Sequence, residues 1–238
     1  MTVRILAAPI AYNEERKIGR VLDRFRPGLA TEVMLVDDGS TDGTPQVARD
    51  RGVRVLRHET RRGVGAAIRS VIRHARADDF DILVILAGND KDRPEEIPQL
   101  VAPIVEDGYD LVQGSRYLPG GHYGNMPLYR QVATRFLHPL LFSLMACRKM
   151  TDTTNGFRAI RLALFDDPRI DLNQAWLDRY ELEPYLLLTA IRIGRRVMEV
   201  PVTKIYPEAE LGYTKMTPII GWWQILKPLF LVGLGLRK

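Results

Sequence analysis

The N-terminal residues 3–43 decide the fold, and they read VRILAAPIAYNEERKIGRVLDRFRPGLATEVMLVDDGSTDG. Within them, residues 3–10 and 33–36 are apolar runs of the kind that forms buried strands. The segment between these runs repeats its apolar side chains at helical spacing, at Ile18, Val21, Leu22 and Phe25. A strand, a helix and a second strand in this order predict the start of a parallel α/β sheet.

The same alternation continues to about residue 115. We predict further strands at 53–56, 82–86 and 111–113, and helices at 64–75 and 94–105. Helices between strands imply a sheet covered on both faces, whose ligands bind at the carboxyl ends of the strands. The polar clusters of this half follow such strand ends, which indicates a ligand site at that edge.

The second half of the chain is less regular. We predict a long helix at 127–146 that is kinked at Pro139, because proline lacks the backbone N–H of a helix interior. A second helix is predicted at 176–193 and an extended stretch at 197–205.

The tail at residues 216–236 contains one charged residue, Lys227, and is interrupted by Pro218, Gly221 and Pro228. Three interpretations are open. It is long enough for a membrane span. The Trp222–Trp223 pair and the central lysine favour a helix lying in the membrane interface. A helix packed on the protein's own core is the third interpretation.

Composition narrows the class of protein. The length of 238 residues suits one large α/β domain, and the single cysteine, Cys147, excludes an internal disulfide. Residues 1–5 lack the apolar stretch of a signal peptide, so we expect a cytoplasmic protein. A net charge of +5 and a pI near 9.4 suit phosphate-bearing ligands or an anionic membrane. The sequence indicates no nucleic-acid-binding module, and we expect no nucleic-acid partner.

Carboxylates follow the second predicted strand. Asp37 and Asp38 stand at its end, where they can accept hydrogen bonds from a base N–H and from ribose hydroxyls. Gly39 and Gly43 permit tight turning beside them. The alternative is an Asp-rich turn that caps the next helix.

Small residues open the helix predicted at 64–75. Arg61 and Arg62 precede Gly63, and Gly65 stands two positions after Gly63. Backbone amides at a helix start beside two arginines suit a pyrophosphate. Close packing of the helix explains the two glycines equally well.

Five motifs occur in the order seen in family 2 glycosyltransferases: Tyr12-Asn13-Glu14, Asp37-Asp38-Gly39-Ser40, Gly63-Val64-Gly65-Ala66-Ala67, Gly114-Ser115-Arg116 and Asn155-Gly156-Phe157-Arg158. The chain resembles this family over roughly residues 3–215, and among its members it is most similar to dolichyl- and polyprenyl-phosphate sugar synthases. The resemblance implies a GT-A-like α/β fold, a single domain on a doubly wound, mostly parallel sheet. It also implies inverting transfer of a sugar from a nucleoside-diphosphate sugar to polyprenyl phosphate or a related membrane-associated acceptor, in surface polysaccharide or glycolipid synthesis.

The resemblance also implies positions for the donor. It assigns the base and ribose to Pro9, Tyr12, Glu14, Asp37 and Asp38. Arg62 and Gly63 are expected at the pyrophosphate, Lys215 near the diphosphate, and Asn89 beside it.

For the acceptor, the resemblance pairs Arg116 with an arginine and a hydroxyl on the next helix, here Arg130 and Thr134. Two guanidinium groups on one phosphate would orient it as a nucleophile, and an anionic oxygen needs no general base. Glu181 and Glu183 stand where related enzymes carry an acidic residue near the acceptor. A saccharide acceptor is the alternative; it would need a carboxylate base, for which Glu181, Glu183 and Asp152 are the candidates.

The chain departs from the family after the fourth strand. The usual Asp-x-Asp, which holds Mg²⁺ or Mn²⁺ against the diphosphate, is replaced by Ala87-Gly88-Asn89, followed by Asp90-Lys91-Asp92. Three interpretations are open: a displaced metal site that uses Asn89, Asp90 and Asp92, a site where Lys91 replaces the metal, and a non-catalytic nucleotide-sugar-binding protein. We expect Mg²⁺ or Mn²⁺ at Asp90 and Asp92, because alternate residues of an extended segment point to the same side.

These inferences divide the chain into a nucleotide half at 1–115, an acceptor half at 116–205 and a basic, aromatic tail at 206–238. The expected location is the inner face of the cell membrane, where the protein would be peripheral. A homo-oligomer is a further expectation.

Overall fold

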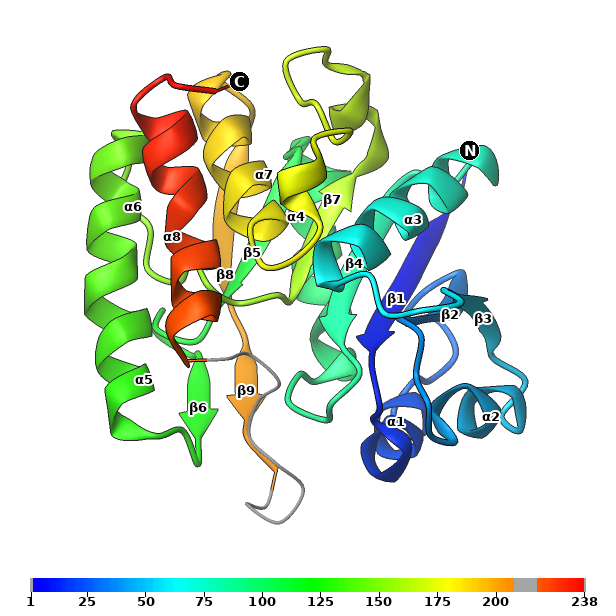
Figure 1. The fold of residues 1–238 in the computed structure, drawn as a ribbon. Helices are drawn as coiled ribbons and strands as arrows, with labels where there is room; N and C mark the ends of the chain where they lie inside the picture. The colour runs from blue at the N-terminus through cyan, green and yellow to red at the C-terminus, as the bar shows by residue number, and fades with distance from the viewer. Residues whose placement is uncertain (1, 208–217, 238) are drawn as a thin grey trace.

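A seven-stranded sheet runs through the computed structural model, which describes residues 2–207 and 218–237. Its strands are β1 (Ile5–Ala11), β2 (Glu32–Asp37), β3 (Arg54–Arg57), β4 (Ile82–Ala87), β5 (Leu111–Ser115), β7 (Arg158–Arg161) and β8 (Val197–Pro201). They lie side by side in the order β3-β2-β1-β4-β7-β5-β8 (Figure 1). Strands β1 to β4 are parallel to their neighbours in this group, and β8 is parallel to β5. The doubly wound, mostly parallel sheet predicted from the sequence is confirmed.

Strand β7 is the exception in the sheet. It pairs antiparallel with β4 on one side and with β5 on the other. This strand comes from the predicted acceptor half, yet it lies between two strands of the predicted nucleotide half. The two halves therefore share one sheet within a single domain.

Helices cover both faces of the sheet. They are α1 (Glu15–Leu22), α2 (Thr44–Arg49), α3 (Val64–Ala77), α4 (Ile97–Asp107) and α7 (Leu182–Arg192), with short 3₁₀ turns at η1 (Pro94–Glu96), η3 (Leu162–Asp166) and η4 (Ala175–Leu177). The side chains of β1 alternate between two cores: Leu6 belongs to the core under α3 and α7, and Ala7 to the core under α1 and α4.

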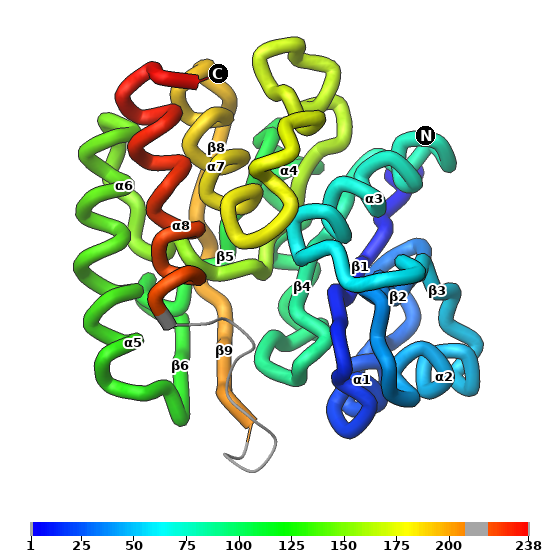
Figure 2. Tube along the Cα trace, viewed as in Figure 1, coloured from blue at the N-terminus to red at the C-terminus, as the bar shows by residue number. Residues whose placement is uncertain are grey.

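The predicted helix 127–146 is present as one continuous rod, seen as a tube in Figure 2. It consists of α5 (Leu128–Val132), a π-helical turn η2 (Ala133–Leu137) and α6 (His138–Ala146). The wider turn directly precedes Pro139, which has no N–H to donate to the preceding turn. At the position of the predicted kink, the helix therefore changes to a π-helical turn and then continues.

Two predicted segments are shorter than expected. The helix predicted at 176–193 begins at Leu182, because η4 and a turn precede it. The extended stretch 197–205 consists of β8 and a separate strand β9 (Thr203–Ile205), which pairs with β6 (His122–Gly124) outside the main sheet.

The tail forms helix α8 (Pro218–Gly233), which lies beside α6 and α7 (Figure 1). Leu229 and Val232 on one side of it are buried in the core, as in the core-packed interpretation. Its other side exposes Ile219, Ile220 and Trp223, as an interfacial helix would. Within residues 2–207 and 218–237, no helix combines the length and the apolar character that a membrane crossing requires.

Candidate active site

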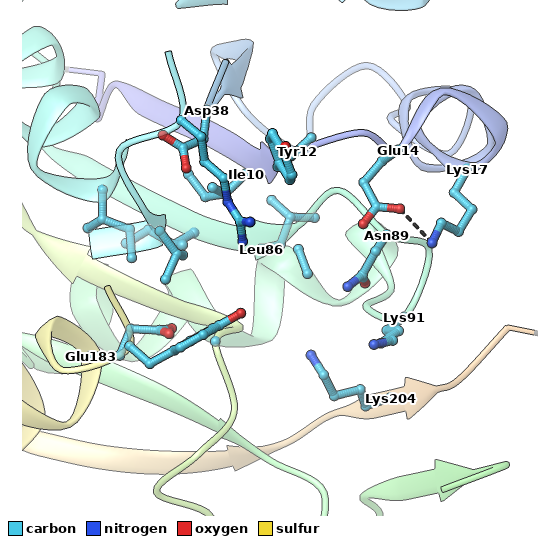
Figure 3. Close-up of a pocket in the computed structure, with 18 residues that line it drawn as sticks. Ile10, Tyr12, Glu14, Lys17, Asp38, Leu86, Asn89, Lys91, Glu183 and Lys204 are labelled. Atoms are coloured by element: carbon cyan, nitrogen blue, oxygen red, sulfur yellow. Dashed lines mark ion pairs between the residues drawn. The ribbon is translucent and has the colours of Figure 1, made fainter. Parts of the chain in front are cut away.

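A cavity of about 370 Å³ lies at the carboxyl ends of β1 and β4 (Figure 3). Apolar side chains from β1, α3 and β4 form part of its wall: Ile10, Val64, Ile68, Ile85 and Leu86. Its polar lining includes Tyr12, Glu14, Lys17, Asp38, Arg61, Asn89, Lys91, Tyr180, Glu183 and Lys204. The ligand site predicted at this edge of the sheet therefore corresponds to a real cavity.

Asp38 lies at one end of this cavity, and its carboxylate accepts three hydrogen bonds. His58 Nδ1 donates to its Oδ1 over 2.8 Å, and so does the Arg62 backbone N–H over 2.9 Å. The Gly63 N–H donates to Oδ2 over 2.8 Å. Nearby, the Arg61 guanidinium lies 4.3 Å from the centre of the Tyr12 ring. The carboxylate is thus preorganised beside a flat cation–aromatic pair that suits a planar base.

The two glycines at the start of α3 lie in close packing, which is the alternative that the sequence left open for them. A Cβ atom on Gly65 would lie 2.0 Å from the Leu177 carbonyl oxygen, and one on Gly63 would lie 2.3 Å from that of Asp178. Both glycines are therefore required by close packing of α3 against residues 177–179. The backbone amides of Arg62 and Gly63 donate to Asp38, so these two amides position the Asp38 carboxylate.

Asp37 and Pro9 are not part of the cavity lining. The side chain of Asp37 is fully buried, its Oδ1 accepts the Ser40 N–H over 3.2 Å, and its Oδ2 lies 3.1 Å from Arg57 Nε. Of the predicted pair of carboxylates, only Asp38 faces the ligand space. Asp37 stabilises the turn after β2 and does not cap the next helix.

Glu14 lines the cavity and forms an ion pair with Lys17 over 2.5 Å. Both side chains are buried, although ionised groups are rarely buried without a partner. Lys17 was not singled out from the sequence. The three-residue spacing from Glu14 at the start of a helix was the available signal.

The segment after β4 is a turn rather than the extended stretch that we expected. Asp90 has a φ of 61° and lies 3.4 Å from Arg24 and 3.8 Å from Arg20. Asp92 is buried; one oxygen binds Lys204 Nζ, and the other accepts the Ala87 N–H over 2.8 Å. The two carboxylates therefore pair with different cations, Asp90 with two arginines and Asp92 with Lys204.

These residues do not fit a divalent cation. Mg²⁺ takes near-octahedral oxygen ligands, usually including carboxylates. In the part of the chain that the structure describes, no three His, Cys, Asp or Glu side chains gather as a metal-binding group. Asn89 faces the cavity with a buried Oδ1 that has no hydrogen-bond partner, but it is an amide rather than a carboxylate. The predicted metal site at Asp90 and Asp92 is not formed by this arrangement.

Two lysines meet at the end of the cavity opposite Asp38 (Figure 3). The Lys91 ammonium lies 4.3 Å from the centre of the Tyr206 ring. Burial lowers the pKa of Lys91 to about 7, and the charges of Lys204 and Arg130 add to the effect. Lys204 Nζ donates to Asp92 and, over 3.0 Å, to Asn155 Oδ1. Lys204 was not predicted as a site residue.

A second cavity of about 150 Å³ adjoins the first. The two share five lining residues: Asn89, Lys91, Tyr180, Glu183 and Lys204. Arg116, Arg130 and Thr134 line the second cavity, together with Trp222 and Ile225 of α8. The predicted acceptor residues are therefore brought together next to the donor cavity.

Arg116 is buried and forms an ion pair with Asp152. Its Nε and one terminal nitrogen donate to the two oxygens of Asp152 over 2.6 and 2.7 Å, and that nitrogen also donates to Thr154 over 2.9 Å. Burial alone lowers the pKa of Arg116, but the charge of Asp152 outweighs it, so the pKa lies above its ordinary value. Asp152 is thereby occupied and is unsuited to act as the free general base that a saccharide acceptor requires.

Thr134 and Arg130 lie on the same turn of the rod. The Thr134 hydroxyl is 2.8 Å from the Arg130 carbonyl oxygen and 2.6 Å from the Tyr117 hydroxyl. Arg130 donates to the Tyr206 hydroxyl over 3.3 Å. Asp152 neutralises Arg116, and Arg130 contacts Tyr206 at the wall of the second cavity.

Glu181 and Glu183 stand at the start of α7 but face different surroundings. Glu181 is buried outside both cavities, and burial raises its pKa. Glu183 lines both cavities and lies 3.4 Å from Arg158. The acidic residue at the junction is therefore Glu183, which corrects the choice of Glu181. Lys215, predicted near the diphosphate, lies outside the described residues.

The first cavity, at the strand ends, thus adjoins a second cavity that is lined by two arginines. Residues 10–167 match the model of glycosyl transferase family 2. The chain belongs to this family and is a glycosyltransferase.

Similar proteins have related names. The undecaprenyl-phosphate mannosyltransferase of Micrococcus luteus is 33% identical over 222 residues, which cover 90% of this chain and 88% of that protein. The dolichyl-phosphate hexose transferase of Haloferax volcanii is 34% identical over 229 residues, covering 95% and 92% of the two chains. These relatives support the predicted resemblance to polyprenyl-phosphate sugar synthases.

Solved structures share the fold. The glucosyl-3-phosphoglycerate synthase of Mycobacterium tuberculosis, in complex with phosphoglyceric acid, superimposes with a TM-score of 0.72 over 99% of this chain and 81% of that one, at 24% identity. This similarity confirms the GT-A fold. The same enzyme has been crystallised with UDP and either Mn²⁺ or Mg²⁺.

Proposed function

We propose that the protein transfers a sugar from a nucleoside-diphosphate sugar to a lipid phosphate, with inversion at the anomeric carbon. The observation that carries the proposal is the pair of adjoining cavities, one of nucleotide size and the other lined by Arg116 and Arg130. The names of the M. luteus and H. volcanii relatives support a lipid-phosphate acceptor. In this proposal the base lies near Tyr12 and Asp38, and the diphosphate lies toward Lys91.

The chemistry needs few groups. An oxygen of the acceptor phosphate attacks the anomeric carbon, the bond from that carbon to the diphosphate breaks, and the electron pair leaves with the diphosphate. A single displacement of this kind inverts the configuration. No proton has to be removed from an already anionic nucleophile, so the protein's task is to align the reactants and to stabilise the charge on the leaving group.

The acceptor would arrive from a membrane. The rod formed by α5, η2 and α6 exposes apolar side chains at every fourth position, and α8 exposes others beside it: Leu128, Val132, Phe136, Leu140, Leu144, Ile219, Ile220 and Trp223. Contiguous exposed apolar surface of this kind is typical of a membrane or protein contact. The same rod carries Arg130 and Thr134, so a lipid phosphate held in the second cavity would have its chain beside this surface. We propose peripheral binding at the inner face of the cell membrane.

One observation favours a second candidate. Glu183 lies at the junction of both cavities, where a saccharide hydroxyl would need a general base. The two candidates differ in their product. A sugar phosphodiester on a lipid extracts into organic solvent, whereas a glycoside of a soluble saccharide stays in water.

The test supplies UDP- and GDP-sugars in turn, with polyprenyl phosphate or with soluble saccharides, and follows labelled sugar into the two phases. We expect label in the organic phase only when polyprenyl phosphate is present, and expect Arg130→Ala to abolish it. Label transferred to saccharides and not to the lipid would favour the second candidate. No transfer with any pair, despite nucleotide binding, would favour a non-catalytic binding protein.

A further inference from the structure

Three basic groups gather where the two cavities join. Lys91, Lys204 and Arg130 all line the second cavity, and the two lysines line the first as well. Lys91 and Lys204 are each less than a tenth exposed. Burying basic side chains this close together is unfavourable unless an anion joins them, because each disfavours the charge of the other.

The fold holds one of these lysines with a carboxylate. Asp92 binds Lys204 Nζ and accepts the Ala87 N–H over 2.8 Å, so it ties the end of β4 to β9. Asn155 supplies a second acceptor for the same ammonium at 3.0 Å. These contacts use two of the three N–H bonds of Lys204, whose side chain lines the first cavity close to Lys91 (Figure 3).

The carboxylates of the segment are placed to support cations. Asp90 faces Arg20 and Arg24, and Asp92 faces Lys204. The side chains that the segment presents to the first cavity are Ala87, Asn89 and Lys91. An amide and an ammonium bind an anion readily, whereas this pair cannot supply the carboxylate oxygens that a divalent cation prefers.

We propose that Lys91 and Lys204 together take the place of a divalent metal at the leaving diphosphate, and that Asp92 positions Lys204 for this role. The inference rests on the proposed function, since it assigns the charge-stabilising groups of the same site. As the anomeric bond breaks, the electron pair moves onto the diphosphate, and the two ammonium groups meet that charge at the β-phosphate. The nucleoside diphosphate leaves with this charge intact, and no proton transfer is required.

The test compares binding of nucleoside diphosphates and monophosphates. Calorimetry with UDP, UMP, GDP and GMP is carried out on the full chain in EDTA and again in Mg²⁺. In EDTA we expect the cognate diphosphate to bind about 10- to 100-fold more tightly than its monophosphate, as charged hydrogen bonds to one phosphate provide. Mg²⁺ should change this ratio less than threefold. A diphosphate preference that appears only in Mg²⁺ would overturn the proposal without any variant.

Variants then assign the residues. Lys91→Gln and Lys204→Gln should each reduce the diphosphate-to-monophosphate ratio about tenfold or more, while monophosphate affinity stays within a few fold. Asp92→Asn should reduce the ratio in the same direction, since it loosens Lys204. If these residues had a merely structural role, the variants would reduce the affinity for the diphosphate and the monophosphate equally. Lys149→Gln removes one exposed lysine outside both cavities and serves as the charge-matched control.

The outcomes separate this inference from the proposed function. Metal-dependent diphosphate binding with unchanged ratios in both lysine variants overturns the lysine pair and leaves the glycosyltransferase proposal standing. If UDP and GDP fail to bind in EDTA and also in Mg²⁺, this result overturns the lysine pair and the glycosyltransferase proposal together.

Discussion

The Arg116 guanidinium, which lines the second cavity, forms a two-pronged hydrogen-bonded pair with the Asp152 carboxylate, with N–O distances of 2.6 and 2.7 Å. Both side chains are essentially excluded from solvent. Asp152 also accepts the Arg116 backbone N–H over 3.0 Å, so the pair joins the end of β5 to the loop before β7. The arginine that sequence comparison associates with phosphate is thus also a structural element of the acceptor loop.

Breaking this pair should destabilise the fold. Asp152→Ala leaves a buried guanidinium without its counter-charge, which we expect to lower the free energy of unfolding by about 3–5 kcal/mol. Chemical denaturation measures the change. The double variant Asp152→Ala with Arg116→Met should recover part of the loss, because no unpaired charge remains. Equal stability of the single and double variants would contradict this account of the pair.

Asp38→Ala should weaken nucleotide binding for two reasons. It removes the acceptor that we propose for the base, and it releases the amides of Arg62 and Gly63 that the carboxylate holds. We expect a loss of about 1–3 kcal/mol in the binding free energy of the cognate nucleoside diphosphate, measured by calorimetry. Glu59→Gln, at an exposed neighbouring position, is the control. Unchanged affinity in Asp38→Ala would show that the base binds elsewhere.

His138 should make stability depend on pH. Its Nδ1 lies 2.6 Å from the Thr153 hydroxyl, and burial lowers its pKa from 6.5 to about 4. Below pH 6.5 His138 binds a proton in the unfolded chain but not in the folded protein. The stability contributed by the neutral His138 is therefore complete above pH 6.5 and is lost as the pH falls toward 4. The slope approaches about 1.4 kcal/mol per pH unit.

The measurement is urea unfolding at several pH values between 7 and 4 for the natural protein and for His138→Gln. The difference between the two removes the titration of other groups. We expect the natural protein to lose stability faster than the variant on acidification. Parallel curves would indicate that the pKa of His138 is not depressed in the folded protein.

The exposed apolar surface should determine membrane binding. Phe136→Asp and Leu140→Asp place charges on the rod and should release the protein from anionic vesicles in a flotation assay. Val105→Asp is the control, since Val105 is about half exposed on the distant helix α4. Deleting residues 217–238 is a less specific test, because it also removes Leu229 and Val232 from the core. Equal flotation of all the point variants would exclude this surface as the membrane contact.

The sequence predicted the fold well because the apolar periodicities of strands and helices are local signals. Residues 3–10 and 33–36 alternate with a helical stripe, and this pattern alone indicates a parallel sheet. Strand β7 was missed because Arg158–Arg161 is short and gains its stability from β4 and β5, which lie far away in the chain.

The site was predicted in outline but not in its contacts. The glycines at 63 and 65 look the same whether a phosphate or residues 177–179 lie against them, and only the tertiary structure distinguishes the two. Asp90 and Asp92 alternate in sequence, yet Asp90 has a left-handed backbone rather than an extended one, and the two carboxylates pair with different cations. Lys204 carried no local signal, because its partner Asp92 is 112 positions away.

The position of β7 has a consequence for biosynthesis. Strands β4 and β5 are close in sequence but are separated in the sheet by a strand that the ribosome adds later. Until residues 158–161 emerge, β4 and β5 carry open strand edges, which are prone to pair with other chains. A fragment ending at residue 115 would therefore be expected to aggregate rather than to serve as an independent nucleotide-binding module. Splitting this protein for complementation should succeed only at a loop that leaves β4, β7 and β5 on one piece.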